Sequence, residues 1–466
     1  MRARWWFVLV AAVALAVGFV VVPATGVAPV AAPCAAAATS TVAPAAGTAP
    51  AGASFTPIAP KRVLDTRTGP GPQGPVTAGA PITLDLSSSV PATATAVVLN
   101  LTGVDASDTD YLEVWPAGTA PPTASNINMV PNRATANLAT VALGTGASAG
   151  KVSILTNRGT VNVVADLAGY YTPGTTGAGY TPRTPQRALD TRTTTGNNPG
   201  AVGAGKSITL DLSGIVPPQA TSVVATLTAT DVTASTFVTA WPSGTAQPTA
   251  SNLNVLPGDT TANLVTVSTG AGEKVSLYNA FGAADLLVDV AGYFAPGNGG
   301  LFVPLSPTRV LDTRSGVGAP TAPVGADSSI AVSTAGTVPT TANAAVVNVT
   351  GVTPSASTFV TAWPDGVARP TASNVNLAAG AITPALASIR LGAGKFDLYN
   401  RNGTIDLLAD VSGYYVSRPP CGAAAPAAPS YGTAPAATTV APPTTAGRTG
   451  GGSESEIDQR QGAPNS

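Results

Sequence analysis

Two short signatures, each present three times, limit what this chain can fold into. The opening signature reads Arg-x-Leu-Asp-Thr-Arg and occupies residues 62–67, 187–192 and 309–314. The closing signature is Asp-x-x-Gly-Tyr plus one more aromatic residue, at 166–171, 289–294 and 410–415. Trp and Pro-Thr-Ala-Ser-Asn-x-Asn recur between them in the same order. This self-similarity predicts one domain used three times.

The signatures and the composition around them predict the division of the chain. Residues 1–38 read as a signal peptide, or a retained N-terminal anchor, with its cleavage region, because Arg2 and Arg4 precede an apolar run that ends at Val22. Residues 39–54 read as a linker. The repeats are expected at 55–173, 180–296 and 301–417, joined by short Gly-rich connectors that allow them to sit as beads with limited slack. Residues 418–466 read as a disordered tail.

Within each repeat the pattern predicts short strands rather than helices. The sequence is rich in turn formers, with 50 Gly and 43 Pro. Residues 97–102 alternate, with Val97, Leu99 and Leu101 on one face and Val98, Asn100 and Thr102 on the other. We therefore expect an all-β fold: three tandem β-sandwich, jelly-roll-like domains between disordered Ala/Pro/Thr-rich N- and C-terminal segments.

Composition excludes several classes of function. The chain has no His and a net charge of −1. A Ser/His/Asp or Cys/His catalytic site is therefore impossible, and no basic surface for nucleic acid is expected. The one metal candidate, Asp105, Asp108 and Asp110, does not recur in the other repeats and reads as a solvated turn. No metal and no cofactor are expected.

The repeated charges predict a structural network in each domain. An Asp in the closing signature lies within an apolar run, and a buried carboxylate needs a cationic partner. The Arg residues that recur in all three repeats are those of the opening signature. The predicted networks are Arg62, Asp65, Arg67 and Asp166; Arg187, Asp190, Arg192 and Asp289; Arg309, Asp312, Arg314 and Asp410. We expect Arg67→Ala to destabilise the fold by leaving Asp166 unpaired.

A candidate ligand-binding platform also recurs. Asn side chains both donate and accept hydrogen bonds, as sugar hydroxyls do, and a Trp lies nearby in sequence. The alternative is that Trp is core and Asn satisfies loop backbone. The candidate residues are Trp115, Asn126 and Asn128; Trp241, Asn252 and Asn254; Trp363, Asn374 and Asn376.

The chain contains two cysteines, Cys34 and Cys421, which flank the repeats. In an oxidising compartment they are candidates for a disulfide that ties the ends of the array or links two molecules. The sequence leaves this pairing and the oligomeric state open.

The paired signatures resemble a repeat that is widespread in secreted actinobacterial proteins. Residues 363–376, Trp-Pro-Asp-Gly-Val-Ala-Arg-Pro-Thr-Ala-Ser-Asn-Val-Asn, carry the resemblance most fully; the first two repeats have Pro121 and Gln247 where Arg369 stands. The resemblance implies an accessory or surface module without a catalytic role.

These observations favour a non-catalytic protein that is secreted or associated with the cell envelope. Paired carboxylates neutralised by Arg argue against a glycosidase. The first hypothesis is a multivalent adhesion or carbohydrate-binding array for cell-wall or extracellular glycan. The alternatives are a structural envelope spacer and an accessory protein for a secreted hydrolase. Contact with a membrane is expected only through an uncleaved N-terminal segment.

Overall fold

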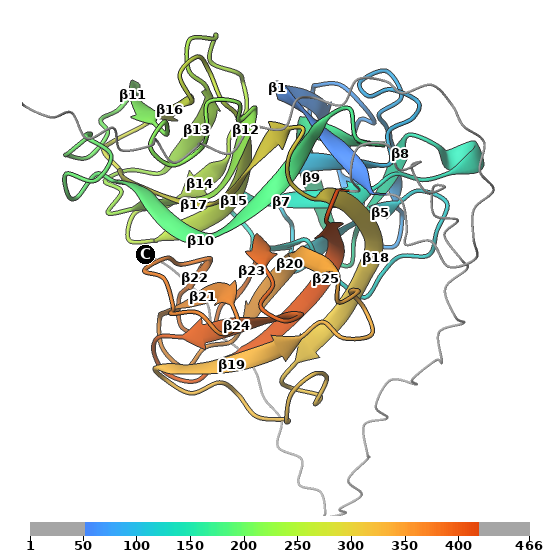
Figure 1. Ribbon diagram of the computed structural model, residues 1–466. Helices are drawn as coiled ribbons and strands as arrows, with labels where there is room; N and C mark the ends of the chain where they lie inside the picture. Colours follow the sequence, from blue (N-terminus) through green and yellow to red (C-terminus); the bar gives the residue numbers. More distant parts are fainter. Residues whose placement is uncertain (1–51, 419–466) are drawn as a thin grey trace, which may run out of the picture. The chain divides into compact units, whose positions relative to one another are not determined.

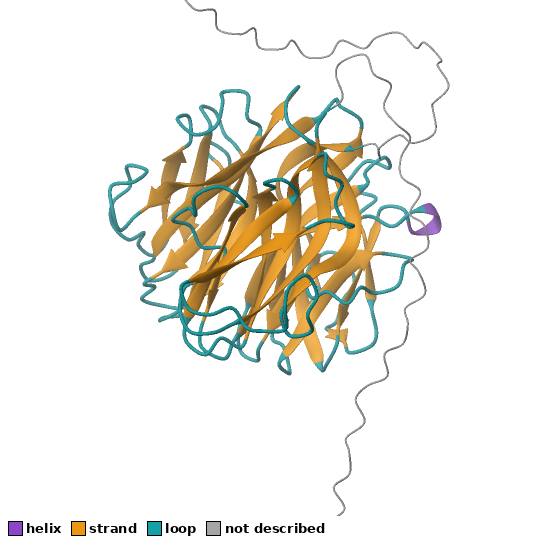
Figure 2. Cartoon of the chain, turned by 60° about the horizontal axis from the view of Figure 1, so that its bottom comes forward, coloured by secondary structure: helices purple, strands orange, loops and turns teal. Residues whose placement is uncertain are grey.

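The computed structural model describes residues 52–418, which fold almost entirely into β-strands (Figures 1 and 2). The predicted signal peptide, most of the predicted linker, the predicted tail and the Cys34–Cys421 pair lie outside these residues. Repeat 1 contains β1 (Ala53–Asp65), β2 (Val76–Thr77), β3 (Ile82–Asp85), β4 (Ala96–Val104), β5 (Asp110–Pro116), β6 (Ile127–Met129), β7 (Thr135–Ala142), a 3₁₀ turn (Gly146–Ser148), β8 (Lys151–Thr156) and β9 (Thr160–Pro173).

Repeats 2 and 3 reproduce these strands without the short β2. Repeat 2 contains β10 (Ala178–Asp190), β11 (Lys206–Asp211), β12 (Ser222–Thr230), β13 (Thr236–Pro242), β14 (Leu253–Val255), β15 (Thr261–Ser268), β16 (Lys274–Asn279) and β17 (Asp285–Pro296). Repeat 3 contains β18 (Leu301–Asp312), β19 (Ser328–Ser333), β20 (Ala342–Val352), β21 (Thr358–Pro364), β22 (Val375–Leu377), β23 (Ile382–Arg390), β24 (Lys395–Asn400) and β25 (Asp406–Val416).

Each repeat is a jelly-roll sandwich of two antiparallel sheets, as the sequence predicts. In repeat 2 the inner sheet has the order β15-β12-β17-β10 and the outer sheet the order β11-β16-β13-β14. Repeats 1 and 3 have the same two orders in their own strands. The first and last strands of a repeat are neighbours in the inner sheet, so the two signatures face each other. Arg62, for example, lies opposite Asp166.

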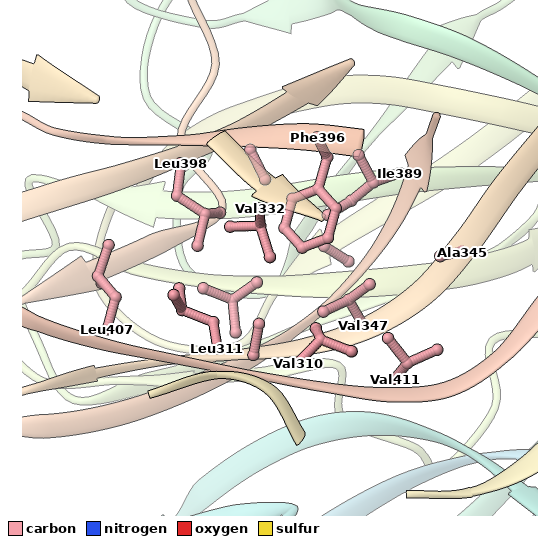
Figure 3. Close-up of a cluster of buried hydrophobic side chains, with 14 of the residues drawn as sticks. Val310, Leu311, Val332, Ala345, Val347, Ile389, Phe396, Leu398, Leu407 and Val411 are labelled. Carbon is pink, nitrogen blue, oxygen red and sulfur yellow. The ribbon is translucent and has the colours of Figure 1, made fainter. Parts of the chain in front are cut away.

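A separate apolar core fills each sandwich. In repeat 3, Leu311 of the opening signature packs with Val332, Phe396 and Leu398, which come from the opposite sheet (Figure 3). Leu64 and Leu189 take the same place in repeats 1 and 2, and all three leucines are fully buried. The Leu of the opening signature therefore belongs to the core of its own repeat.

The three repeats do not behave as beads on a string, and this expectation was wrong. The inner sheets are continuous, because β1 pairs with both β10 and β18. The second connector is part of this pairing: Tyr180 and Gly300 exchange two backbone hydrogen bonds of 2.8 and 2.7 Å. Short Gly-rich connectors here allow close approach of backbones rather than independent motion. The repeats lie in one compact unit.

A fourth apolar cluster, the central cluster, lies between the repeats. This cluster covers the face of each inner sheet that points away from the core of its own sandwich. The strands β4, β12 and β20 are therefore buried on both faces. Corresponding residues of the three repeats meet there. They are Phe55, Tyr180 and Phe302; Tyr171, Phe294 and Tyr415; Val98, Val224 and Val346; Leu138, Leu264 and Leu386.

Aromatic pairs connect the repeats within the central cluster. Ring centroids of different repeats lie 4.3 Å apart for Phe55 and Phe294, and 4.4 Å apart for Tyr180 and Tyr415. The hydroxyls of Tyr171 and Tyr415 are 2.7 Å apart and hydrogen-bonded, so neither is left unsatisfied in the apolar interior. The last aromatic residue of each closing signature thus joins neighbouring repeats.

The Gly of the closing signature is required by the same packing. A Cβ added to Gly169 or Gly413 would lie 2.3 Å from Cζ of Phe55 or Phe302, and one on Gly292 would lie 2.5 Å from the Tyr180 hydroxyl. In each repeat an aromatic ring of the first strand covers a bare backbone position of the last strand. Only Gly permits this contact.

We predict that Gly413→Ala destabilises the protein by about 1–3 kcal/mol, because the fully buried Phe302 ring cannot move away from the added methyl group. Thermal unfolding of the purified variant measures the loss. Gly214→Ala is the matched control, since no heavy atom lies within 4 Å of its Cβ position. Equal melting temperatures for the two variants would contradict the account of this glycine.

Candidate functional site

In each repeat an Arg of the opening signature holds the buried Asp of the closing signature. Arg62 Nε and Nη2 donate to the two oxygens of Asp166 at 2.8 and 3.2 Å. Asp166 is only 2% exposed. Burial raises the pKa of Asp166, and the hydrogen bonds from Arg62 oppose this rise. The equivalent pairs are Arg187–Asp289 and Arg309–Asp410.

The second Arg of the opening signature has a different partner from the one we expected. Arg67 forms two hydrogen bonds of 2.9 Å with Asp65 and does not reach Asp166. The expectation that Arg67→Ala leaves Asp166 unpaired was therefore wrong. The hydrogen bond from Arg67 lowers the pKa of Asp65, and Arg192 lowers the pKa of Asp190 to about 2. Asp312 pairs with Arg314 in the same way.

The Thr between Asp and Arg also has a structural role, which the sequence reasoning missed. Thr66 Oγ1 accepts a hydrogen bond from the backbone N–H of Val163 at 3.0 Å and donates to Asn162. Thr191 and Thr313 do the same with the last strands of their repeats. In the sequence, the only indication of this role is that the Thr recurs together with the charged residues. Every constant position of the opening signature now has a structural partner.

The same signature also links neighbouring repeats in a cycle. Arg62 of repeat 1 donates to the Thr249 carbonyl of repeat 2 at 2.7 Å, and Arg187 of repeat 2 donates to the Thr371 carbonyl of repeat 3 at 2.9 Å. Arg309 of repeat 3 returns to the Thr123 carbonyl of repeat 1 at 3.3 Å. These carbonyls belong to the Pro-Thr-Ala-Ser-Asn segments, so this recurring segment is an acceptor for the next repeat.

The Trp side chains follow the alternative in which Trp is part of the core, and do not form the candidate ligand platform. Trp115, Trp241 and Trp363 are 3%, 6% and 5% exposed. Each indole N–H donates to a backbone carbonyl four residues further on. The rings are thus part of the fold, and the platform hypothesis fails for them because no face is available to stack on a sugar.

The two Asn residues of each Ser-Asn-x-Asn run have separate roles. Asn126 Oδ1 accepts a hydrogen bond of 2.8 Å from the Val114 N–H. Asn252 and Asn374 accept the corresponding bonds from Ala240 and Ala362. The first Asn therefore holds its own loop. The second Asn of each run lines a cavity shared by the three repeats; these residues are Asn128, Asn254 and Asn376.

This shared cavity has a volume of about 1080 Å³. It is comparable to the upper end of the range for small-molecule sites, about 300–1,000 Å³. The half-buried rings of Tyr111 and Phe359 contribute apolar surface. Turns between the last two strands of repeats 1 and 3 add Asn157 and Asn402. One site is thus built from three repeats, rather than one site in each.

Three buried polar atoms of residues that line the shared cavity have no hydrogen-bond partner within residues 52–418. They are Nδ2 of Asn254, Oδ1 of Asp110 and Oδ2 of Asp259, the last of which lies 2.7 Å from Arg133 in an ion pair. The equivalent Asn128 and Asn376 bond to Ser125 and Ser373. Buried polar atoms are normally satisfied. These atoms are almost inaccessible from the cavity, but the side chains of Asn128, Asn254 and Asn376 are only half-buried, so the cavity offers amide groups from all three repeats to a ligand rich in hydroxyl groups.

The acidic residues of β5 lie on opposite faces of the strand, and Asp110 is bound within its own repeat. Asp110 Oδ2 accepts hydrogen bonds from Thr156 Oγ1 and the Arg158 N–H. Asp110 and Glu113 lie three residues apart on β5, so their side chains leave opposite faces of the strand. No group of three His, Cys, Asp or Glu residues that could hold a metal ion occurs in the described part of the chain.

Within the described residues, no helix has the length and apolar character needed to cross a membrane.

We predict that removing Arg62 is far more destabilising than removing Arg67. Arg62→Ala leaves a buried carboxylate unpaired, at a cost of about 3–5 kcal/mol. Arg67→Ala loses a partly exposed pair and costs about 1 kcal/mol or less. Urea unfolding of both variants gives the two free energies of unfolding. A larger loss for Arg67→Ala would contradict the observed pairing.

Glu113 predicts a pH dependence of stability. Burial, with repulsion from Asp110, raises its pKa from 4.5 to about 7. Between pH 4.5 and about pH 7 the folded protein keeps a proton on Glu113 that the unfolded chain has released. The free energy of unfolding therefore falls as pH rises through this range. We expect Glu113→Gln to match the wild type at about pH 4 and to exceed it by about 1–3 kcal/mol at about pH 8. A pH-independent difference in urea unfolding would contradict this.

Comparisons with known proteins give only remote likenesses. No protein-family model matches the chain, and no curated protein matches it. A structure described as the triple jelly roll fold and turret assembly in an archaeal virus shares 10% identity with a TM-score of 0.17, covering 78% of this chain and 91% of that chain. The N-terminal CBM22-1–CBM22-2 tandem domain of Paenibacillus barcinonensis Xyn10C also shares 10% identity with a TM-score of 0.17, covering 54% and 100%. A structure from Sulfolobus Turreted Icosahedral Virus gives 10% identity and a TM-score of 0.16, covering 78% and 91%.

Proposed function

We propose that this protein is a non-catalytic glycan-binding protein of the extracellular space or cell envelope, with one binding site formed by all three repeats. The observation that carries the proposal is the shared cavity, which is lined by Asn128, Asn254 and Asn376 at equivalent positions of the three repeats. Amide side chains donate and accept hydrogen bonds, as sugar hydroxyls do, so a polyhydroxy ligand matches them.

The pairing and burial of the repeated Asp residues support a non-catalytic role. Asp166 and its two equivalents are bound by Arg and buried, so they cannot exchange protons with a substrate. The shared cavity has two acids, Asp110 and Asp259, and Asp259 is paired with Arg133 at 2.7 Å. Asp110 has no second carboxylate beside it on the same face of its strand. Hydrolysis of a glycosidic bond by the usual route needs two.

A structural envelope spacer is the second candidate function. The burial of Trp115, Trp241 and Trp363 favours it, because an adhesive array of three independent sites would expose aromatic rings. The central cluster, which joins the repeats, also suits a load-bearing body. The resemblance to repeats of secreted actinobacterial proteins is compatible with both candidates and supports the proposed location.

The decisive experiment is a glycan array with the purified full chain, followed by titration calorimetry of any ligand found. We expect one glycan per chain. Asn254→Ala should weaken binding about two- to tenfold, the effect of one hydrogen bond, and the triple variant Asn128→Ala/Asn254→Ala/Asn376→Ala should abolish it.

The matched control is Asn298→Ala, an exposed Asn outside the shared cavity. Binding that survives the triple variant with an unchanged dissociation constant would place the site elsewhere. A chain that binds no glycan at all would contradict the proposal and leave the spacer as the function.

A further inference from the structure

The three junctions between repeats are not equivalent. At the junction of repeats 1 and 2, Asn263 Nδ2 donates to Asn100 Oδ1 at 2.9 Å. At the junction of repeats 3 and 1, Asn137 Nδ2 donates to Asn348 Oδ1 at 3.2 Å. The corresponding positions of repeats 2 and 3 hold Thr226 and Ala385. The third junction therefore lacks the Asn pair.

The shared cavity extends into this third junction. Repeat 2 contributes Arg187, Arg192, Thr228 and Thr230 to its lining, and repeat 3 contributes residues 369–373. Arg62 and Arg309, the equivalents of Arg187, are not part of the lining. Differences between the repeats therefore give the cavity one distinct side.

The lining of the cavity carries an excess of positive charge. Six Arg residues line it against two Asp residues, Asp110 and Asp259; the six are Arg133, Arg158, Arg187, Arg192, Arg369 and Arg401. The whole chain has a net charge of −1, so this excess is local. A cavity lined by one sign of charge concentrates ligands of the opposite sign.

Four of these guanidinium groups already have carboxylate partners. Arg133 pairs with Asp259 and Arg401 with Asp327, while Arg187 and Arg192 belong to the network of the opening signature. Arg158 and Arg369 have no carboxylate oxygen within 4.0 Å in the described part of the chain. Both are exposed. They are the cations available to a ligand.

Arg369 is held in place for this role. Its guanidinium carbon lies 3.4 Å from the ring centroid of the buried Tyr399. Stacking on an aromatic face restricts the side chain while its N–H groups stay free along the edge. Repeats 1 and 2 have Pro121 and Gln247 at this position, so the molecule has one such group.

We propose that the shared cavity binds an acidic oligosaccharide, with a carboxylate of the sugar on Arg369. This inference rests on the proposed glycan-binding function and specifies its ligand class. The planar fork of Arg369 matches the two oxygens of a carboxylate. Asn254 binds a hydroxyl group of the same oligosaccharide, and Arg158, at the turn before β9, neutralises a second acidic unit.

The test is titration calorimetry of the full chain with tetragalacturonate and with a neutral galactose tetrasaccharide, at low and high salt. We expect one site per chain, at least tenfold tighter binding of the acidic ligand, and loss of that preference at about 0.5 M salt, where exposed charges are strongly screened. Arg369→Gln should weaken acidic binding about 10- to 100-fold, as expected for a charged hydrogen-bonded pair, and leave neutral binding unchanged.

Arg390→Gln is the matched control, because it removes one exposed Arg outside the cavity and should change neither affinity. Equal, salt-independent binding of both tetrasaccharides would overturn this inference and leave the proposed function intact. Acidic binding that Arg369→Gln does not change would overturn the placement on Arg369. Absence of binding by either ligand, together with an empty glycan array, would overturn both.

Discussion

The bidentate pair between Arg62 and Asp166, repeated in each domain, is the interaction on which the rest of the structure depends. It fixes the register between the first and last strands, because the two residues face each other across the inner sheet. The guanidinium also reaches the next repeat through the Thr249 carbonyl. One side chain therefore connects the closure of a single sandwich to the association of neighbouring sandwiches. A buried ion pair contributes little net stability, and its value here lies in specifying one register and one partner.

Burial of the inner sheets on both faces follows from that association. A lone sandwich would expose the face that carries Val98 and Leu138, and a large apolar surface of this kind is rarely left in water. The central cluster removes it from water in all three repeats at once. The amide of Asn100 on this face is satisfied across a junction, by Ser251 and Asn263. Each repeat is therefore completed by the other two.

The sequence allowed the strands, the sandwich fold and the pairing of recurring Arg with buried Asp to be predicted, since these depend on residue type and period within one repeat. It did not reveal the association of the repeats. Alternation in β4 places Val97 and Asn100 on opposite faces of the strand. The face with Asn and Thr has the same sequence pattern whether it is covered by water or by another repeat, so the pattern does not distinguish the two cases. The choice between Arg62 and Arg67 as the partner of Asp166 was also beyond the pattern. It depends on a shift of register between Arg62 and Leu64, which turns the following residues away from Asp166.

The direction of β9 gives the molecule two distinct ends. The strand begins at Thr160, two residues after Arg158 in the cavity lining, and finishes at Pro173, opposite Ala53. Its length of roughly 40 Å, at about 3.3 Å per residue, separates those two points. Gly52 bonds to Gly174 and Arg418 to Gly177, so the described chain enters and leaves beside the finish of β9. A molecule tethered through either of these points would hold its cavity at the far pole, facing away from the surface that carries it.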